Sequence, residues 1–66
     1  MHIRLNGERK QLEPGCTVEK LLAVFRLDPQ RIAVELNRAI LPRSLYGENT
    51  LKEGDEIEIV RFIGGG

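Results

Sequence analysis

The chain has 66 residues, and its ten basic residues balance ten acidic ones. A domain of this size buries only about 60% of the surface that its unfolded chain exposes, which favours a carrier, adaptor or binding module over a self-contained enzyme. The neutral balance argues against charge-driven binding to nucleic acid or to an anionic membrane. No apolar run approaches the roughly 20 residues that span a bilayer. The first residues already alternate, so we expect no signal peptide and a cytoplasmic protein.

The N-terminal residues predict a β-hairpin. Ile3 and Leu5 alternate with polar residues, as in a half-buried strand. Asn6-Gly7 supplies the two positive-φ residues of a tight hairpin turn. The segment "ERKQL", residues 8–12, then returns as a second strand, and its charges are typical of a sheet edge.

A helix follows Pro14-Gly15. Thr17 is its predicted N-cap, and Glu19 lies in the first turn, where the helix dipole favours negative charge. Asp28-Pro29 is expected to end the helix, because proline disfavours helical geometry in the residue before it. The predicted buried face has the spacing i, i+3, i+4, i+7 and consists of Val18, Leu21, Leu22 and Phe25.

The C-terminal half predicts three more strands. Residues 32–36 alternate, Asn37-Arg38 makes a turn, and residues 39–41 form a short strand that Pro42 ends. The last strand is "EIEIVRFI", residues 56–63. Between the last two strands lies an irregular segment in which the expected apolar anchors are Leu45, Tyr46 and Leu51.

The element order predicts an α+β fold of the β-grasp, or ubiquitin-like, class. Two strands form a hairpin, the helix crosses over, and the last strand is expected beside the first, in the middle of a mixed sheet of about five strands. The sheet carries its one main helix on a single face. We assign residues 1–63 to this domain and residues 64–66 to a flexible C-terminal glycine tail.

Side chains for catalysis or metal binding are not evident. His2 is the only histidine, and the chain has no Ser/His/Asp set, no His/Cys cluster and no glycine-rich phosphate loop. Cys16 is the only cysteine, which excludes an intramolecular disulfide. It lies near the start of the predicted helix, where cysteines can be reactive. We interpret it instead as a small structural residue.

The apolar pattern of the last strand changes face. Ile57 and Ile59 point to one side, whereas Val60 and Phe62 fall on the other. A bulge or a covered strand end is one explanation. We favour the alternative that Val60 and Phe62 form an exposed patch that docks a partner.

The chain ends in Gly64, Gly65 and Gly66. Glycine has no side chain to bury, so these residues contribute little to a fold. A tail without β-carbons can instead thread a narrow channel and deliver its terminal carboxylate to a deep active site. Directly after the last strand of a β-grasp, such a tail indicates an acyl group that another enzyme activates.

These features resemble the ThiS family, the sulfur carriers of thiamine biosynthesis. The resemblance covers essentially the whole chain, from the "NG" hairpin and "TVEKLLAVF" to the glycine end. Its specific pieces are "VELN" (34–37), "PRS" (42–44), Gly54-Asp55 and "IEIV" (57–60).

The resemblance implies that the chain is a protein cosubstrate rather than an enzyme. A ThiF-like adenylating enzyme of the E1 type would activate the Gly66 carboxylate with ATP, and the chain itself would bind no cofactor. A persulfide, typically from a cysteine desulfurase, would convert the adenylate to a thiocarboxylate. A ThiG-like thiazole synthase would then take up the sulfur.

Other functions fit the same features. The chain could carry sulfur for molybdopterin synthesis, for tRNA thiolation or for amino-acid synthesis. It could instead be a ubiquitin-like protein modifier joined to lysines through Gly66, or an interaction module whose glycines are inert.

Overall fold

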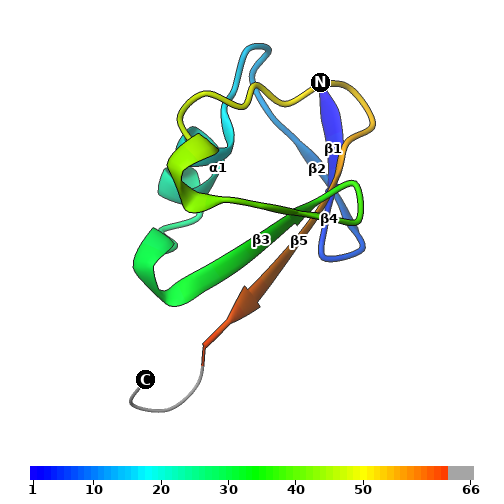
Figure 1. Ribbon diagram of the computed structural model, residues 1–66. Coiled ribbons are helices and arrows are strands. Elements are labelled where there is room, and N and C mark those ends of the chain that lie inside the picture. The colour runs from blue at the N-terminus through cyan, green and yellow to red at the C-terminus, as the bar shows by residue number, and fades with distance from the viewer. Residues whose placement is uncertain (63–66) are drawn as a thin grey trace.

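The computed structural model describes residues 1–62, in which five strands form one mixed sheet with a single α-helix against one face (Figure 1). The predicted domain boundary at residue 63 and the tail lie outside the described residues. The order of the strands across the sheet is β2-β1-β5-β3-β4. This is the β-grasp architecture that the sequence predicts. The elements are β1 (His2–Leu5), β2 (Glu8–Gln11), α1 (Val18–Val24), η1 (Pro29–Arg31), β3 (Ile32–Leu36), β4 (Ala39–Leu41), η2 (Arg43–Leu45) and β5 (Glu56–Arg61).

Two tight turns fix the register of the outer strands. Asn6 and Gly7 have φ angles of 50° and 83°, and Asn37 and Arg38 have φ angles of 51° and 70°. Positive φ at both central residues defines the hairpin turn whose twist matches that of the strands it joins. Both predicted hairpins are therefore confirmed, with Leu5 opposite Glu8 in one and Leu36 opposite Ala39 in the other.

The last strand, β5, lies at the centre of the sheet, as predicted. It runs parallel to β1 and antiparallel to β3, with Leu5 and Leu36 on either side of Ile57. The pairing with β3 continues for five residue pairs, out to Ile32 opposite Arg61. The strand that leads to the C-terminus is thus held on both sides.

Helix α1 begins as predicted. The Thr17 hydroxyl accepts a hydrogen bond of 3.1 Å from the Lys20 amide, and Glu19 lies in the first turn. Val18, Leu21 and Leu22 are buried against the sheet. No helix within residues 1–62 is long and apolar enough to cross a membrane.

The end of α1 differs from the prediction. Arg26 adopts a left-handed φ of 57°, and the amides of Leu27 and Arg26 donate to the carbonyls of Leu22 (2.8 Å) and Ala23 (3.1 Å). This pair of bonds is a Schellman motif, which closes the helix before it reaches Asp28. Phe25 is consequently the C-cap residue and is 36% exposed, so its assignment to the buried face was wrong.

Asp28-Pro29 has a role other than the expected one of ending α1. The Asp28 carboxylate accepts a hydrogen bond of 2.9 Å from the Gln30 amide, and Pro29 occupies the first position of η1. The two residues therefore begin a short 3₁₀-helix that feeds directly into β3.

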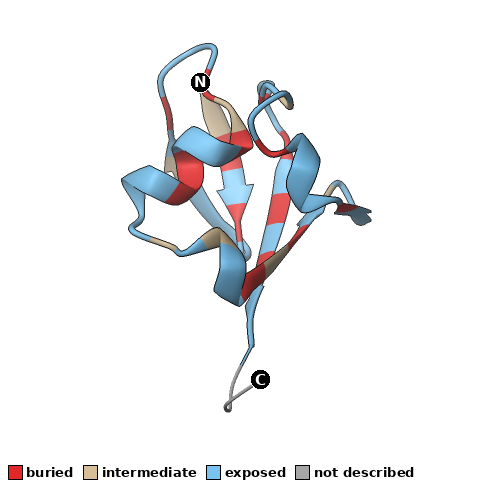
Figure 2. Ribbon diagram, turned by 60° about the vertical axis from the view of Figure 1, so that its left-hand side comes forward, coloured by how far each residue is buried: buried red, intermediate tan, exposed pale blue. Residues whose placement is uncertain are grey.

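The core fills the space between α1 and the sheet (Figure 2). Of the three anchors expected in the irregular segment, Tyr46 and Leu51 are buried, whereas Leu45 is 40% exposed and is not an anchor. The most completely buried side chains come from three strands and the helix: Ile3, Val18, Leu21, Leu22, Ile32, Val34 and Ile57.

Candidate functional site

The glycines that carry the functional prediction, Gly64, Gly65 and Gly66, lie outside the described residues. What the structure shows is the strand from which they extend. In β5, Ile57 and Ile59 are buried, whereas Val60 and the first residue after the strand, Phe62, are 53% and 57% exposed. Residues 60–62, here called the tail half of β5 although Phe62 lies just past the strand, therefore emerge from the core at the C-terminal end of the described residues.

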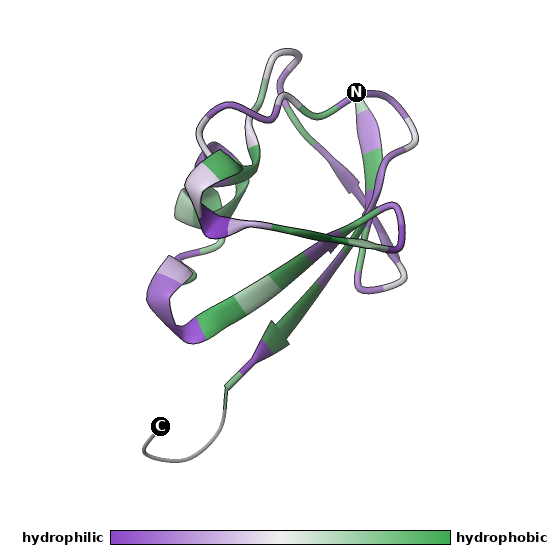
Figure 3. Ribbon diagram, viewed as in Figure 1, coloured by the Kyte–Doolittle hydropathy of each residue, from purple (hydrophilic) through white to green (hydrophobic). Residues whose placement is uncertain are grey.

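The change of face in β5 occurs without a bulge. The register with β3 is unbroken through Glu35–Glu58, Val34–Ile59 and Ala33–Val60. Val60 therefore lies on the face of the sheet turned away from α1, here called the open face. Figure 3 shows hydrophobic and hydrophilic residues along β5, and Figure 2 shows its C-terminal end exposed. The explanation by a bulge or a covered strand end is wrong, and exposure of Val60 and Phe62 is confirmed.

Beyond the end of β1, an asparagine side chain forms the hydrogen bonds to β5 that a strand would otherwise form. β1 stops at Leu5, so Ile59 has no backbone partner on that side. The Asn6 side chain fills the place. Its Oδ1 accepts a bond of 2.7 Å from the Ile59 amide, and its Nδ2 donates to the Ile59 carbonyl at 3.3 Å. On the other side, the Phe62 amide donates to the Arg31 carbonyl at 3.0 Å. The tail half is thus anchored through its backbone while its side chains stay exposed.

A second asparagine supports the start of the same strand. Asn37 Oδ1 accepts a bond of 2.9 Å from the Glu56 amide, and its Nδ2 donates to Asp55 Oδ1 at 3.1 Å. Asp55 is buried, and its other oxygen accepts a 2.8 Å bond from the Lys52 amide. The sequence indicated Asn6 and Asn37 as turn residues only. Their contacts with β5 were missed, because they require the two hairpins to flank that strand.

The open face is apolar and acidic around Val60. Glu35 and Glu58 lie directly opposite each other on β3 and β5, and both are exposed. Neither belongs to the ion pairs found within residues 1–62. Ile40, opposite Glu35 on β4, is 77% exposed. Like charges at directly opposed positions destabilise a sheet slightly, so this face is not optimised for stability alone.

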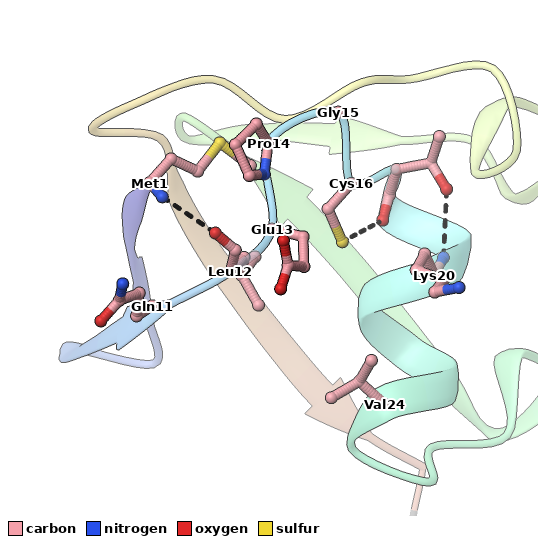
Figure 4. A pocket seen from close by; sticks show the side chains of 10 residues that line it. Met1, Gln11, Leu12, Glu13, Pro14, Gly15, Cys16, Lys20 and Val24 are labelled. Carbon is pink, nitrogen blue, oxygen red and sulfur yellow. Dashed lines mark hydrogen bonds between the residues drawn. The ribbon is translucent and has the colours of Figure 1, made fainter.

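Cys16 lies in the wall of an open hollow of about 910 Å³ beside the start of α1 (Figure 4). Its side chain is only 7% exposed, and its Sγ donates to the Thr17 carbonyl at 3.4 Å. The burial agrees with the structural interpretation of this residue. Within residues 1–62, no three His, Cys, Asp or Glu side chains are grouped so that they could hold a metal ion.

Comparison with known proteins gives consistent results. Residues 3–66 match the model of the ThiS family. The sulfur carrier protein ThiS of Bacillus subtilis is 38% identical over 65 residues, which are 97% of this chain and 98% of the relative. The crystal structure of the thiamine biosynthesis protein ThiS from Geobacter metallireducens has a TM-score of 0.86 and 30% identity, and the match covers both chains fully.

A second kind of relative is much longer. The thiazole synthase of Magnetococcus marinus is 48% identical over 66 residues, which are 100% of this chain but 20% of that protein. The chain thus spans about a fifth of the length of the thiazole synthases that it matches.

Proposed function

This chain belongs to the ThiS family, the sulfur carrier proteins of thiamine biosynthesis, and we propose that it carries its sulfur as a thiocarboxylate on Gly66. Members of this family are small carriers rather than enzymes. The observation that supports the site is the placement of β5: a central strand ends at Arg61, and the sequence after it ends in three glycines.

The chemistry needs an activation step, because a carboxylate would have to expel oxide. Attack of the Gly66 carboxylate on the α-phosphorus of ATP forms an acyl-adenylate and releases pyrophosphate. A persulfide then attacks the acyl carbon and AMP leaves. A thiol finally reduces the new S–S bond, which leaves the thiocarboxylate on the carrier. ATP and the persulfide are supplied by partners, and the chain contributes the acyl group.

Three partners follow from this chemistry. A ThiF-like adenylating enzyme of the E1 type would supply the ATP site, a cysteine desulfurase the persulfide, and a ThiG-like thiazole synthase would accept the sulfur. The third has support from the comparisons, since one thiazole synthase contains a segment 48% identical to the whole of this chain. We place these steps in the cytoplasm, where ATP is available.

Docking is assigned to the exposed residues beside the tail. Val60 and Phe62 are the exposed large apolar side chains at the C-terminal end of the described residues. An apolar contact there would seat the domain while Gly64 and Gly65 thread the channel of the partner. A single exposed apolar side chain needs no such explanation. Two exposed apolar side chains within three residues, at the end of a central strand, form a patch.

Intact-mass spectrometry tests the proposal. The parent, incubated with ATP, the activating enzyme and a persulfide donor, should gain the mass difference between sulfur and oxygen. Deleting Gly66 moves the carboxylate by at most about 3.6 Å, which exceeds the roughly 0.5 Å tolerance of a preorganised site. That variant, and one with a residue added after Gly66, should gain no sulfur. Sulfur gain by the shortened chain at the parental rate would contradict the mechanism, and lysine-linked adducts would indicate a modifier.

A further inference from the structure

Three arginines gather where the tail begins. A pocket of about 280 Å³ at the end of β5 is lined by Arg26, Arg31 and Arg61, with Phe62 beside them and Asp28 as the one carboxylate in its wall. All three arginines are exposed. Arg31 lies 3.7 Å from Asp28, whereas Arg26 and Arg61 have no ion pair within residues 1–62. A chain of zero net charge therefore has a positive pocket at the base of its tail.

Arg26 occupies a position that is unfavourable for an arginine. It is the left-handed residue that closes α1, with a φ of 57°. Glycine is strongly preferred at this position, because a β-carbon is crowded in the left-handed conformation. Glycine would close the same helix with less strain. The stability of the fold therefore does not explain the arginine. What arginine has and glycine lacks is an exposed positive charge, and we take this charge to be its function.

The pocket must face any protein that receives the tail. Phe62 lines it, and four residues follow to the end of the chain. Four residues extend at most about 14 Å. If Gly66 reaches an active site inside a partner, as the proposed function requires, the surface of that partner has to approach Phe62 within this length. The arginine pocket is then at the contact.

We propose that the arginine pocket binds acidic side chains that border the tail-receiving opening of the activating enzyme. Opposite charges beside such an opening accelerate encounter and fix orientation, more than they add affinity. The inference rests on the proposed function. We choose the activating enzyme rather than thiazole synthase as the partner. In Magnetococcus marinus the segment that matches this chain is part of the thiazole synthase polypeptide itself, so the two parts do not need to meet by diffusion.

The chain offers a matched pair of variants. Arg26→Gly removes one charge and one left-handed β-carbon. Arg38→Gly does the same in the turn between β3 and β4, where φ is 70°. That turn contacts Glu56, since the Asn37 amide donates to its carbonyl at 2.7 Å. It therefore lies at the opposite end of β5 from Arg61, about 16 Å along the strand. Figure 1 shows this turn and the C-terminal end of β5 at opposite ends of the sheet.

The experiment measures the association rate of each variant with the activating enzyme by stopped flow. At about 0.1 M salt, where the Debye length is about 10 Å, Arg26→Gly should associate at least about threefold more slowly than the parent, and Arg38→Gly at the parental rate. At about 1 M salt the three rates should converge, because the charges are then screened beyond about 3 Å. Both variants should melt at or above the parental temperature, since both lose strain.

Two results would overturn the inference. Equal slowing by both variants would mean that only net charge matters, and parental association by Arg26→Gly would mean that the pocket does not dock. Titration with ATP alone gives a third test, in which shifts of the Arg26 and Arg61 side-chain NMR signals would identify a nucleotide site instead. A failure of the proposed function is separate, because it appears as a parent that gains no sulfur even when binding is normal.

Discussion

The two halves of β5 differ in how their apolar side chains are buried. In the core half, residues 56–59, apolar and acidic side chains alternate and the apolar ones are buried. In the tail half, residues 60–62, exposure is high on both faces, although Val60 and Phe62 are as hydrophobic as core residues. The change occurs beyond Ile57, the last residue of β5 that pairs with β1. The first half thus contributes side chains to the core, whereas the second half leaves its apolar side chains exposed, where the proposed function assigns them to docking.

Truncation in the core half should have the largest effect on stability. Ile57 is 1% exposed and lies between β1 and β3. Ile57→Ala should lower the free energy of unfolding by about 2–5 kcal/mol, which in a domain of this size approaches its whole stability. Denaturant unfolding measures the loss, with Val60→Ala as the neighbouring control that should change it by less than about 0.5 kcal/mol. An equal loss of unfolding free energy in the two variants would show that the two halves do not differ in their contribution to stability.

Removing the side chain that joins the halves should have an intermediate effect. Asn6→Gly keeps a residue suited to the φ of 50° but removes both bonds to Ile59. Leaving partly buried backbone groups unpaired should cost about 1–3 kcal/mol. Hydrogen exchange should locate the loss: the Ile59 amide should exchange faster relative to the Ile57 amide than it does in the parent. A uniform acceleration would show that Asn6 matters only for global stability.

Phe25 lines a pocket together with Ile59 and Arg61, one residue from each half, and should contribute less to stability than a core residue. Its ring is 36% exposed, with Lys10 Nζ 5.8 Å from the ring centroid. Phe25→Ala should therefore cost about 1 kcal/mol, well below the roughly 3–5 kcal/mol of a fully buried phenylalanine. A thermal melt of the variant decides between the two values. Loss of the folded state in this variant would show that Phe25 contributes to stability as a core residue does.

The tail half should give the smallest effect on stability and a clear effect on binding. Phe62→Ala should change the free energy of unfolding by less than about 0.5 kcal/mol, because the side chain is 57% exposed. Its complex with the activating enzyme should nevertheless weaken, which calorimetric titration measures. Parental affinity in a stable variant would remove Phe62 from the docking surface.

Local patterns in the sequence predicted most of the fold. The paired turn residues, the Thr17 cap and the alternation of β3 and β5 are each encoded within a few positions. The same reasoning failed at Phe25, because the helix is closed by Arg26 in a conformation for which glycine or asparagine is the usual signal. The prediction of Leu45 as a buried anchor was also wrong. In an irregular segment, buried residues do not recur at a regular spacing, so the sequence pattern does not identify them.

The candidate site divides in the same way. The exposure of Val60 and Phe62 follows from one parity change along β5 and was visible in the sequence. The bonds from Asn6 to Ile59 join residues 53 positions apart, and the pocket brings Arg61 beside Arg26 and Arg31, which lie at least thirty positions earlier in the chain. Such contacts depend on which strands lie side by side, which no single segment specifies.

The central place of β5 has a mechanical consequence. A partner that grips the tail pulls along the axis of this strand, and the hydrogen bonds to its neighbours lie roughly across that axis. The load is then shared by all of the bonds to β1, β3 and Asn6 at once, in shear. At a sheet edge, the same pull would be opposed by the bonds to one neighbouring strand only. The proposed passage of the tail from one enzyme to the next would therefore leave the last strand within the sheet.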